Sequence, residues 1–147
     1  MAEFKINKFD QIGIVVKNIE KAVDFYNSYF NFKGPINIVE QWSDVVYKQK
    51  NVRFKMKKVM QTINQIQFEI VELVESNGDH LYLDFLNQGN EGLHHLGIYT
   101  KEAQQFITEF KTKYNIVVIQ TGKVGKVNFY YLDTRNLIGY FIELISF

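Results

Sequence analysis

The chain of 147 residues contains no cysteine and a single proline. The absence of cysteine rules out disulfides, thiolate metal sites and cysteine nucleophiles, so any bound metal must be held by nitrogen and oxygen donors. Positive and negative charges nearly cancel, leaving a net charge of +1. The composition therefore gives no electrostatic argument for binding nucleic acid or a membrane surface. No uncharged hydrophobic run is long enough to span a bilayer.

The remaining composition is that of an ordinary globular chain, with 46% hydrophobic and 22% charged residues. Its length suits one domain, residues 1–147, with a sizeable core. The first residues, Met1 to Lys5, lack the apolar core of a signal peptide, so we expect a cytoplasmic protein. Aromatic residues are abundant (13 Phe and 9 Tyr), which is typical either of aromatic-rich strands around a cavity or of a bulky core.

Two short apolar stretches, residues 9–16 and 92–99, have the same form. Aligning Gln11 with His95 also matches Gly13 to Gly97, and both stretches are followed by a helical pattern. Because side chains alternate along a strand, Gln11 and Gly13 share one face, as do His95 and Gly97. We expect the glycines to leave space on this face for a ligand. The same alternation places His94 on the other face, with Leu96 and Ile98.

The order of predicted elements repeats in the two halves, which indicates a duplicated α+β fold. Each half reads βαβββ, with module one at about 7–75 and module two at about 91–147. In module one we expect strands at 9–16, 36–42, 52–57 and 66–74 and a helix at 18–30, with 43–51 ambiguous. In module two we expect strands at 92–100, 116–121, 127–132 and 139–146 and a helix at 101–114, with turns at Gly122, Gly125 and 133–136. Between the modules, 80–86 can form one or two helical turns.

Each module offers one polar residue on its first strand and one acidic residue on its last, giving Gln11 with Glu72 and His95 with Glu143. A carboxylate among apolar strand residues is costly to bury unless it is paired or bound to metal. This mixed oxygen and nitrogen set suits a divalent ion such as Zn, Ni, Co, Mn or Fe. Taken singly, each residue is equally explained as a structural or solvated side chain.

Residues 10–26, the run Gly92-Leu93-His94-His95-Leu96-Gly97 and the closing Ile142-Glu143-Leu144 resemble the vicinal oxygen chelate superfamily, the group of glyoxalase I and methylmalonyl-CoA epimerase. The resemblance implies two tandem βαβββ modules that form a curled, mostly antiparallel sheet around a metal cavity. It also implies Gln11, Glu72, His95 and Glu143 as metal ligands, with Glu69 as an alternative to Glu72. Members form the cavity within one chain or between two, so a homodimer is expected.

The resemblance implies proton transfer next to a carbonyl, through a metal-chelated enediolate, on a small 2-oxo or thiol-adduct substrate. Glu143 would be the base and Glu72 a ligand and second base. Ring-cleaving dioxygenases of the group place a histidine where Gln11 stands, and some glyoxalases carry the Gln, Glu, His, Glu set found here. The leading expectation is therefore a glyoxalase-type lyase or isomerase.

Two alternatives stay open. In an acyl-CoA epimerase like methylmalonyl-CoA epimerase, a second glutamate is expected where Phe54 stands, although Glu40 or Asp44 could substitute. A non-catalytic protein of the same fold would only bind a small molecule.

Three further features have weaker interpretations. His94 is expected to be structural, and His80 to lie in a loop without an assigned role. A group of basic residues near the third strand either covers a solvated edge strand or binds the anionic groups of a thiol cofactor; its members are Lys48, Lys50, Arg53, Lys55, Lys57 and Lys58.

Overall fold

The computed structural model describes residues 5–34 and 36–147. Within these residues it contains eight strands and four helices. Their bounds are β1 Gln11–Val15, α1 Ile19–Tyr29, β2 Val39–Tyr47, β3 Lys50–Ile63, β4 Ile66–Ser76, α2 Leu81–Asn87, β5 Gly92–Tyr99, α3 Ala103–Tyr114, β6 Val118–Val124, β7 Val127–Leu132, α4 Arg135–Ile138 and β8 Phe141–Ser146. Residues 1–4, part of the segment considered for a signal peptide, lie outside the described residues.

The strands form one closed barrel in the order β1-β4-β3-β2-β6-β7-β8-β5. Strand β1 is parallel to β4 and β5 is parallel to β8, while all other neighbours are antiparallel. The α+β class and the curled, mostly antiparallel sheet are confirmed. The sheet also closes on itself, because Val45–Tyr47 of β2 pairs with residues 120–122 of β6. The two modules therefore meet at two seams, β1–β5 and β2–β6.

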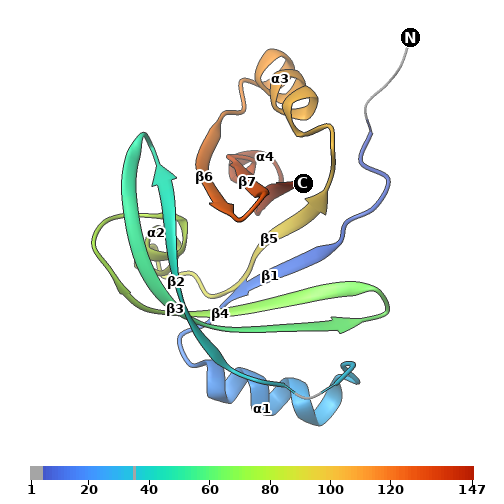
Figure 1. Cartoon of the computed structure of the whole chain (residues 1–147), viewed down its shortest axis with the longest axis vertical. Helices are drawn as coiled ribbons and strands as arrows, with labels where there is room; N and C mark the ends of the chain where they lie inside the picture. Colours follow the sequence, from blue (N-terminus) through green and yellow to red (C-terminus); the bar gives the residue numbers. More distant parts are fainter. Residues whose placement is uncertain (1–4, 35) are drawn as a thin grey trace.

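Helices α1 and α3 pack on the outside of the barrel, near opposite ends of the molecule in Figure 1. Helix α1 begins where the Asn18 side chain accepts a hydrogen bond from the backbone N–H of Lys21 at 3.0 Å, as the sequence predicts. Its Ile19 is fully buried against Val59 and Ile70. Helix α3 packs in the same way on module two, through Phe106.

Helix α2 connects the two modules and contributes buried side chains to the core. Its buried residues Leu81, Tyr82 and Phe85 pack among strand residues such as Phe54 and Val71. The prediction of one or two helical turns here is confirmed. Because α2 is a core element, its side chains can reach the site described below.

The largest errors in the predicted boundaries fall in module one, where β2 starts later and β3 is much longer than expected. Lys48 and Gln49 adopt positive φ values of 48° and 69° and form a tight hairpin turn that connects β2 to β3. The ambiguous stretch 43–51 is therefore strand, turn and strand. In module two, residues expected to form a turn after β7 instead make the single helical turn α4.

Candidate active site

The seam between β1 and β5 places each polar residue of one module over a glycine of the other. Gln11 lies opposite Gly97, and His95 lies opposite Gly13. A Cβ atom on Gly13 would lie 1.9 Å from His95 Cε1, and one on Gly97 would lie 2.9 Å from Gln11 Cβ. The expectation that these glycines leave space for a ligand is therefore wrong. The space is filled by the imidazole and amide side chains themselves.

His95 and His94 both turn toward the barrel interior, which the strand alternation did not predict. The pairing of β1 with β5 shifts by one residue: Gly13 pairs with His95, but Ile14 pairs with Leu93. His94 is therefore the extra residue of a β-bulge in β5. His94 packs against the rings of Phe85 and Phe141, and its Nδ1 lies 2.8 Å from His95 Nδ1. The contact leaves the other ring nitrogen of His95, Nε2, directed at the site.

Gln11 is oriented by hydrogen bonds on the side away from His95. Its Nε2 donates to Gln67 Oε1 at 2.8 Å, and the Tyr99 hydroxyl donates to the same oxygen at 3.1 Å. The amide oxygen of Gln11 therefore faces His95, with Oε1 at 3.0 Å from His95 Nε2. This orientation presents an oxygen donor to the site.

Two carboxylates complete the cluster, and one of them is not the predicted residue. Glu143 Oε1 lies 3.3 Å and Glu69 Oε1 lies 3.5 Å from His95 Nε2. Glu69 pairs in register with Gly13 on β1, just as Glu143 pairs with Gly97 on β5. The two acids therefore occupy equivalent positions in the two modules, and Glu69 takes the place that the sequence analysis gave to Glu72.

Glu72 lies on the opposite face of β4, toward helix α1. Its Oε1 accepts a hydrogen bond from the backbone N–H of Ile19 at 2.8 Å, and its Oε2 lies 3.8 Å from Lys57 Nζ. Glu72 is three positions after Glu69, an odd number, so the strand alternation directs the two side chains to opposite faces. The assignment of Glu72 as ligand and second base is corrected on this ground, because the side chain stabilises the start of α1.

Burial and the two carboxylates set the protonation of His95. Burial alone would lower the pKa of the imidazole, but the negative charges of Glu143 and Glu69 outweigh it and raise the pKa to about 9. Burial likewise opposes ionisation of Glu69, but hydrogen bonding and charge from His95 and Lys58 lower its pKa to about 2. In the metal-free protein the site therefore holds an imidazolium between two carboxylates.

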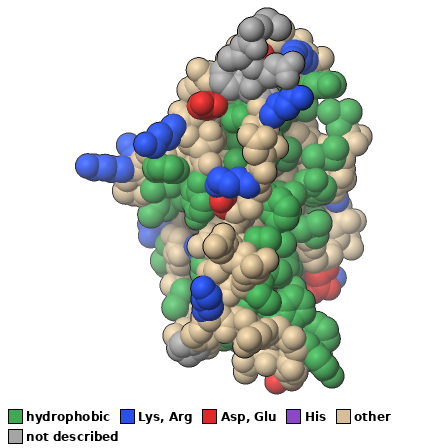
Figure 2. All heavy atoms as spheres, turned by 90° about the vertical axis from the view of Figure 1, so that its right-hand side faces the viewer, with side chains coloured by type: hydrophobic (Ala, Val, Ile, Leu, Met, Phe, Trp, Pro, Cys, Tyr) green, Lys and Arg blue, Asp and Glu red, His purple; other side chains and the backbone are tan. Residues whose placement is uncertain are grey.

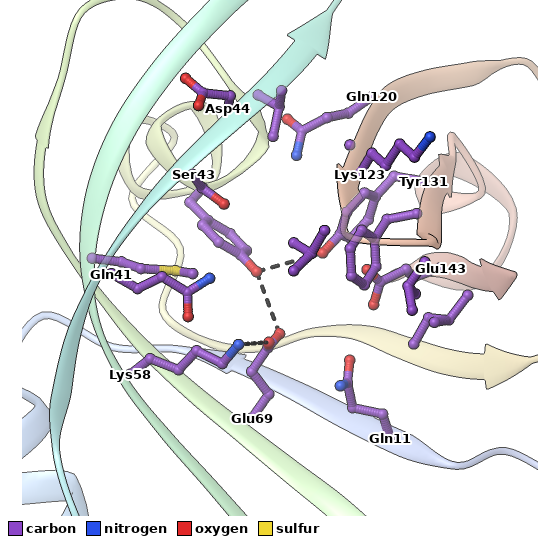
Figure 3. A pocket seen from close by; sticks show the side chains of 18 of the residues that line it. Gln11, Gln41, Ser43, Asp44, Lys58, Glu69, Gln120, Lys123, Tyr131 and Glu143 are labelled. Atoms are coloured by element: carbon purple, nitrogen blue, oxygen red, sulfur yellow. Dashed lines mark hydrogen bonds and ion pairs between the residues drawn. The ribbon is translucent and has the colours of Figure 1, made fainter. Parts of the chain in front are cut away.

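Gln11, Lys58, Glu69 and Glu143 border a cavity of about 500 Å³ inside the barrel. Figure 3 shows Gln11, Glu69 and Glu143 gathered at one end of this cavity, with Lys58 directed at Glu69. Lys58 Nζ lies 3.3 Å from Glu69 Oε2, and Phe54, Met56 and the rings of several aromatic residues provide apolar walls. The cavity therefore combines a charged end with an apolar body, as small-molecule sites do.

At the charged end of this cavity, the sequence analysis did not identify Tyr82 and did not separate Lys58 from the other basic residues. Lys58 lies on the inward face of β3 with Met56 and Met60, whereas the basic residues at odd-numbered positions, such as Lys57, lie on the outward face. The alternation of side chains along the strand could have distinguished Lys58 from Lys57. Lys57 faces the outside of the barrel, where its Nζ donates a hydrogen bond to Glu20 at 3.0 Å. Tyr82 comes from the inter-module helix, where no periodicity indicated an inward direction.

The remaining sequence candidates lie apart from the charged cluster. Phe54 is a buried core residue stacked on His80, which is itself fully buried in the core, with a pKa lowered to about 4 by burial. Glu40 pairs with Lys55 at 3.1 Å on the outer surface. Asp44 lines the cavity but lies away from Glu69 and Glu143 in Figure 3, with a largely exposed side chain.

The side chains of Gln11, Glu69, His95 and Glu143 offer the oxygen and nitrogen donors that divalent metal ions bind. Within the described residues, no three His, Asp or Glu side chains form a preassembled metal site. Yet His95 Nε2 lies 3.0–3.5 Å from three oxygens, and neighbouring ligands around an ion with bonds of about 2.1 Å also lie roughly 3 Å apart. Glu143 Oε1 is buried without a well-aligned hydrogen bond from any described residue. An oxygen in this state is a suitable ligand, so Gln11, Glu69, His95 and Glu143 fit the ion.

None of the helices in the described parts of the chain is long and apolar enough to cross a membrane. Proteins of known structure share the fold at low sequence identity. A hypothetical protein from Bacillus halodurans aligns with a TM-score of 0.68 and 22% identity over 97% of this chain and 96% of its own. Methylmalonyl-CoA epimerase from Mycobacterium tuberculosis aligns with a TM-score of 0.66 and 12% identity, over 99% and 91% of the two chains.

The Streptomyces coelicolor methylmalonyl-CoA epimerase, in complex with 2-nitronate-propionyl-CoA, aligns with a TM-score of 0.57 and 19% identity, over 97% and 95% of the two chains. No protein of curated function matches the sequence. A family model, described as the Glyoxalase/Bleomycin resistance protein/Dioxygenase superfamily, matches residues 10–131, which include Gln11, Glu69 and His95. The chain belongs to this superfamily, the vicinal oxygen chelate group that its sequence motifs resemble.

Proposed function

We propose that the protein is a metal-dependent lyase or isomerase of glyoxalase type, which moves a proton on a carbon next to a carbonyl group. Its substrate would be a small 2-oxo compound or a thiol adduct. One observation carries the proposal: Glu143 is buried beside His95 at one end of a cavity, with a carboxylate oxygen that lacks a well-aligned hydrogen bond from the described residues. A carboxylate in this state can accept a proton from a bound molecule.

Gln11, Glu69 and His95 would hold the ion, with Glu143 in or beside its coordination shell. A bound divalent ion would supply positive charge next to the oxygen on which negative charge develops. Lys58 neutralises part of the charge of Glu69 at 3.3 Å, which leaves Glu143 as the stronger candidate for the base. The apolar walls at Phe54 and Met56 would exclude water while the proton moves.

The first experiment measures metal content and hemithioacetal isomerisation. Protein purified without added metal should hold a divalent ion, and His95→Ala should lose it. Glu72→Gln is the matched control for Glu69→Gln, because both acids lie on β4 but only Glu69 faces the cavity. We expect Glu69→Gln to weaken metal binding and Glu72→Gln to leave it unchanged. Wild-type protein without metal or turnover would contradict the proposal.

A second candidate function is acyl-CoA epimerisation. Two observations favour it. Methylmalonyl-CoA epimerases share the fold of this chain. In addition, Glu69 and Glu143 approach His95 from different modules. Opposed carboxylates can remove and return a proton on opposite faces of one carbon. Deuterium uptake at the branched carbon of a 2-methyl-branched acyl-CoA, without hemithioacetal turnover, would reverse the ranking. A divalent ion taken up with neither activity would support a non-catalytic binding protein.

We also propose a cytoplasmic homodimer. Figure 2 shows many hydrophobic side chains on the face viewed there, with charged side chains scattered among them. Apolar surface of this kind can be buried between subunits. Light scattering coupled to gel filtration should give twice the 17.4 kDa chain mass, and a monomer at micromolar concentration would contradict the expectation.

A further inference from the structure

Tyr82 reaches the charged end of the cavity from outside both βαβββ modules. It is the second residue of α2, and its side chain is 4% exposed. Its hydroxyl lies 3.5 Å from Glu69 Oε1 and 3.5 Å from the Tyr131 hydroxyl. Both distances exceed the 2.5–3.0 Å usual for a hydrogen bond between two oxygens. The phenol is therefore close to the acids but is not held in a short hydrogen bond with them.

The phenol of Tyr82 lines the cavity, with its hydroxyl between Glu69 and Tyr131. A tyrosine hydroxyl carries its proton near neutral pH, because its ordinary pKa is about 10. Figure 3 shows the Tyr131 side chain on the same side of the cavity as Glu143. A neutral phenol lining a cavity beside two acids has a proton to donate to a bound molecule.

We propose that the hydroxyl group of Tyr82 binds the substrate oxyanion. This inference rests on the proposed function. When Glu143 removes the carbon-bound proton, the C–H electron pair forms a carbon–carbon double bond and the carbonyl π pair moves onto oxygen. Tyr82 donates a hydrogen bond to that oxygen and keeps its own proton. The proton on Glu143 then returns to the former carbonyl carbon. The hydroxyl group on the carbon that lost its proton gives its own proton to the oxyanion and becomes the new carbonyl group, so atoms and electrons balance without another reagent.

The enediolate of the proposed function defines the class of ligand to test: planar molecules with two neighbouring oxygens that carry negative charge. Oxalate is a simple probe of this class, because it is a planar dianion without a carbon-bound proton. Its binding tests Tyr82 independently of turnover. Calorimetry would titrate oxalate into Co²⁺-loaded wild-type protein, Tyr82→Phe and Tyr47→Phe.

Tyr47→Phe is the matched control. Tyr47 is also buried and also contacts α2, through a hydrogen bond from its hydroxyl to Asp84, but it does not line the cavity. In Tyr82→Phe the ring keeps its packing on Phe54 and His94. We expect Tyr82→Phe to weaken oxalate binding roughly tenfold or more, the usual effect of losing a hydrogen bond to a charged group. Its Co²⁺ affinity should stay within about twofold of wild type, and Tyr47→Phe should bind oxalate as wild type does.

The outcomes separate the two proposals. Equal oxalate affinity in wild type and Tyr82→Phe, or no oxalate binding by Co²⁺-loaded wild type, overturns the role of Tyr82. A matching loss of Co²⁺ in Tyr82→Phe also overturns it, since the effect is then on the metal site. If oxalate binding depends on Tyr82 but the wild type moves no proton on any tested substrate, the donor role stands and the proposed catalytic function fails.

Discussion

The two modules use the same scaffold positions but surround their acids differently. In module one, Glu69 is paired with Lys58 at 3.3 Å, and Gln11 is fixed by Gln67 at 2.8 Å. In module two, His95 contacts His94, and Glu143 keeps a buried oxygen without a well-aligned hydrogen bond from the described residues. Module one thus presents side chains that are already neutralised and oriented. Module two presents an imidazole and an acid that can exchange protons.

This difference indicates how a duplicated fold can divide its chemistry. Equivalent backbone positions fix where the four side chains lie, and their neighbours decide what each can do. Glu69 contacts two cationic side chains, Lys58 and His95, whereas Glu143 contacts His95 but not Lys58. We therefore expect variants in module two to impair proton transfer and variants in module one to impair positioning.

The largest effect, a loss of kcat, should come from replacing Glu143 by glutamine, and the same replacement of Glu69 is the comparison. Glu143→Gln should lower kcat by roughly 10²–10⁴-fold, the usual loss when a general base is removed. Glu69→Gln should keep most of its kcat once the metal is saturating, because it removes a ligand and not the base. Steady-state kinetics across a metal titration measures both. Equal losses of kcat at saturating metal would show that the modules do not divide the chemistry.

The next largest effect should come from the two facing glycines. Gly13→Ala places a methyl group 1.9 Å from the His95 ring, while the methyl group of Gly97→Ala would lie 2.9 Å from Gln11 Cβ, a smaller overlap. We expect Gly13→Ala to lower the free energy of unfolding by about 3 kcal/mol and Gly97→Ala by about 1 kcal/mol. Urea denaturation of the metal-free proteins compares them. A Gly97→Ala variant as unstable as Gly13→Ala would contradict the stated packing.

A pH effect should follow from module two alone, because His95 titrates and Gln11 does not. The folded pKa of His95, about 9, is above its ordinary value of 6.5. Its stabilising charge is therefore fully present below pH 6.5 and is lost as the pH rises through 9. The metal-free protein should lose at most about 3 kcal/mol over this interval.

Urea denaturation between pH 6 and pH 9.5 tests this effect, with His95→Gln as the control that should show a flatter profile. Metal binding should release the same proton, so apparent metal affinity should rise with pH up to about 9. Identical pH profiles of stability for wild type and His95→Gln would contradict the assignment of the charge to His95.

The smallest effect should distinguish the starts of the two outer helices. Glu72 accepts a hydrogen bond from Ile19 N–H at α1, whereas Glu102 makes no side-chain cap bond at α3. Glu72→Ala should lower the free energy of unfolding by about 1 kcal/mol, and Glu102→Ala by less than about 0.5 kcal/mol. Thermal unfolding measures both, and metal affinity serves as the second readout. Loss of metal in Glu72→Ala would return this residue to the site.

Much of the fold was predictable because duplication left clear signals. The Gln11 and His95 strands and both outer helices follow from hydrophobic periodicity and one cap. The choice between Glu69 and Glu72 needed a different comparison, since Phe68-Glu69-Ile70 matches Ile142-Glu143-Leu144 with both acids on the inward face. The sequence analysis chose Glu72, which lies on the other face of β4, against the start of α1.

Other features could not be read from periodicity. The bulge that turns His94 inward depends on how β1 and β5 pair, which is a property of two strands and not of either sequence alone. The inward direction of Tyr82 depends on where α2 enters the barrel. The closure between β2 and β6 likewise requires the curvature of the whole sheet.

The reciprocal packing of Gln11 over Gly97 and His95 over Gly13 links the two modules. Neither module can exchange its glycine for a larger residue without displacing a side chain of the other module, because that side chain occupies the volume above the glycine. Two side chains of different chemistry, an imidazole and an amide, thus depend on the same kind of space in the opposite module. A chimaera that takes one module from a relative should therefore fold only when that module has a glycine at the position equivalent to Gly13 or Gly97.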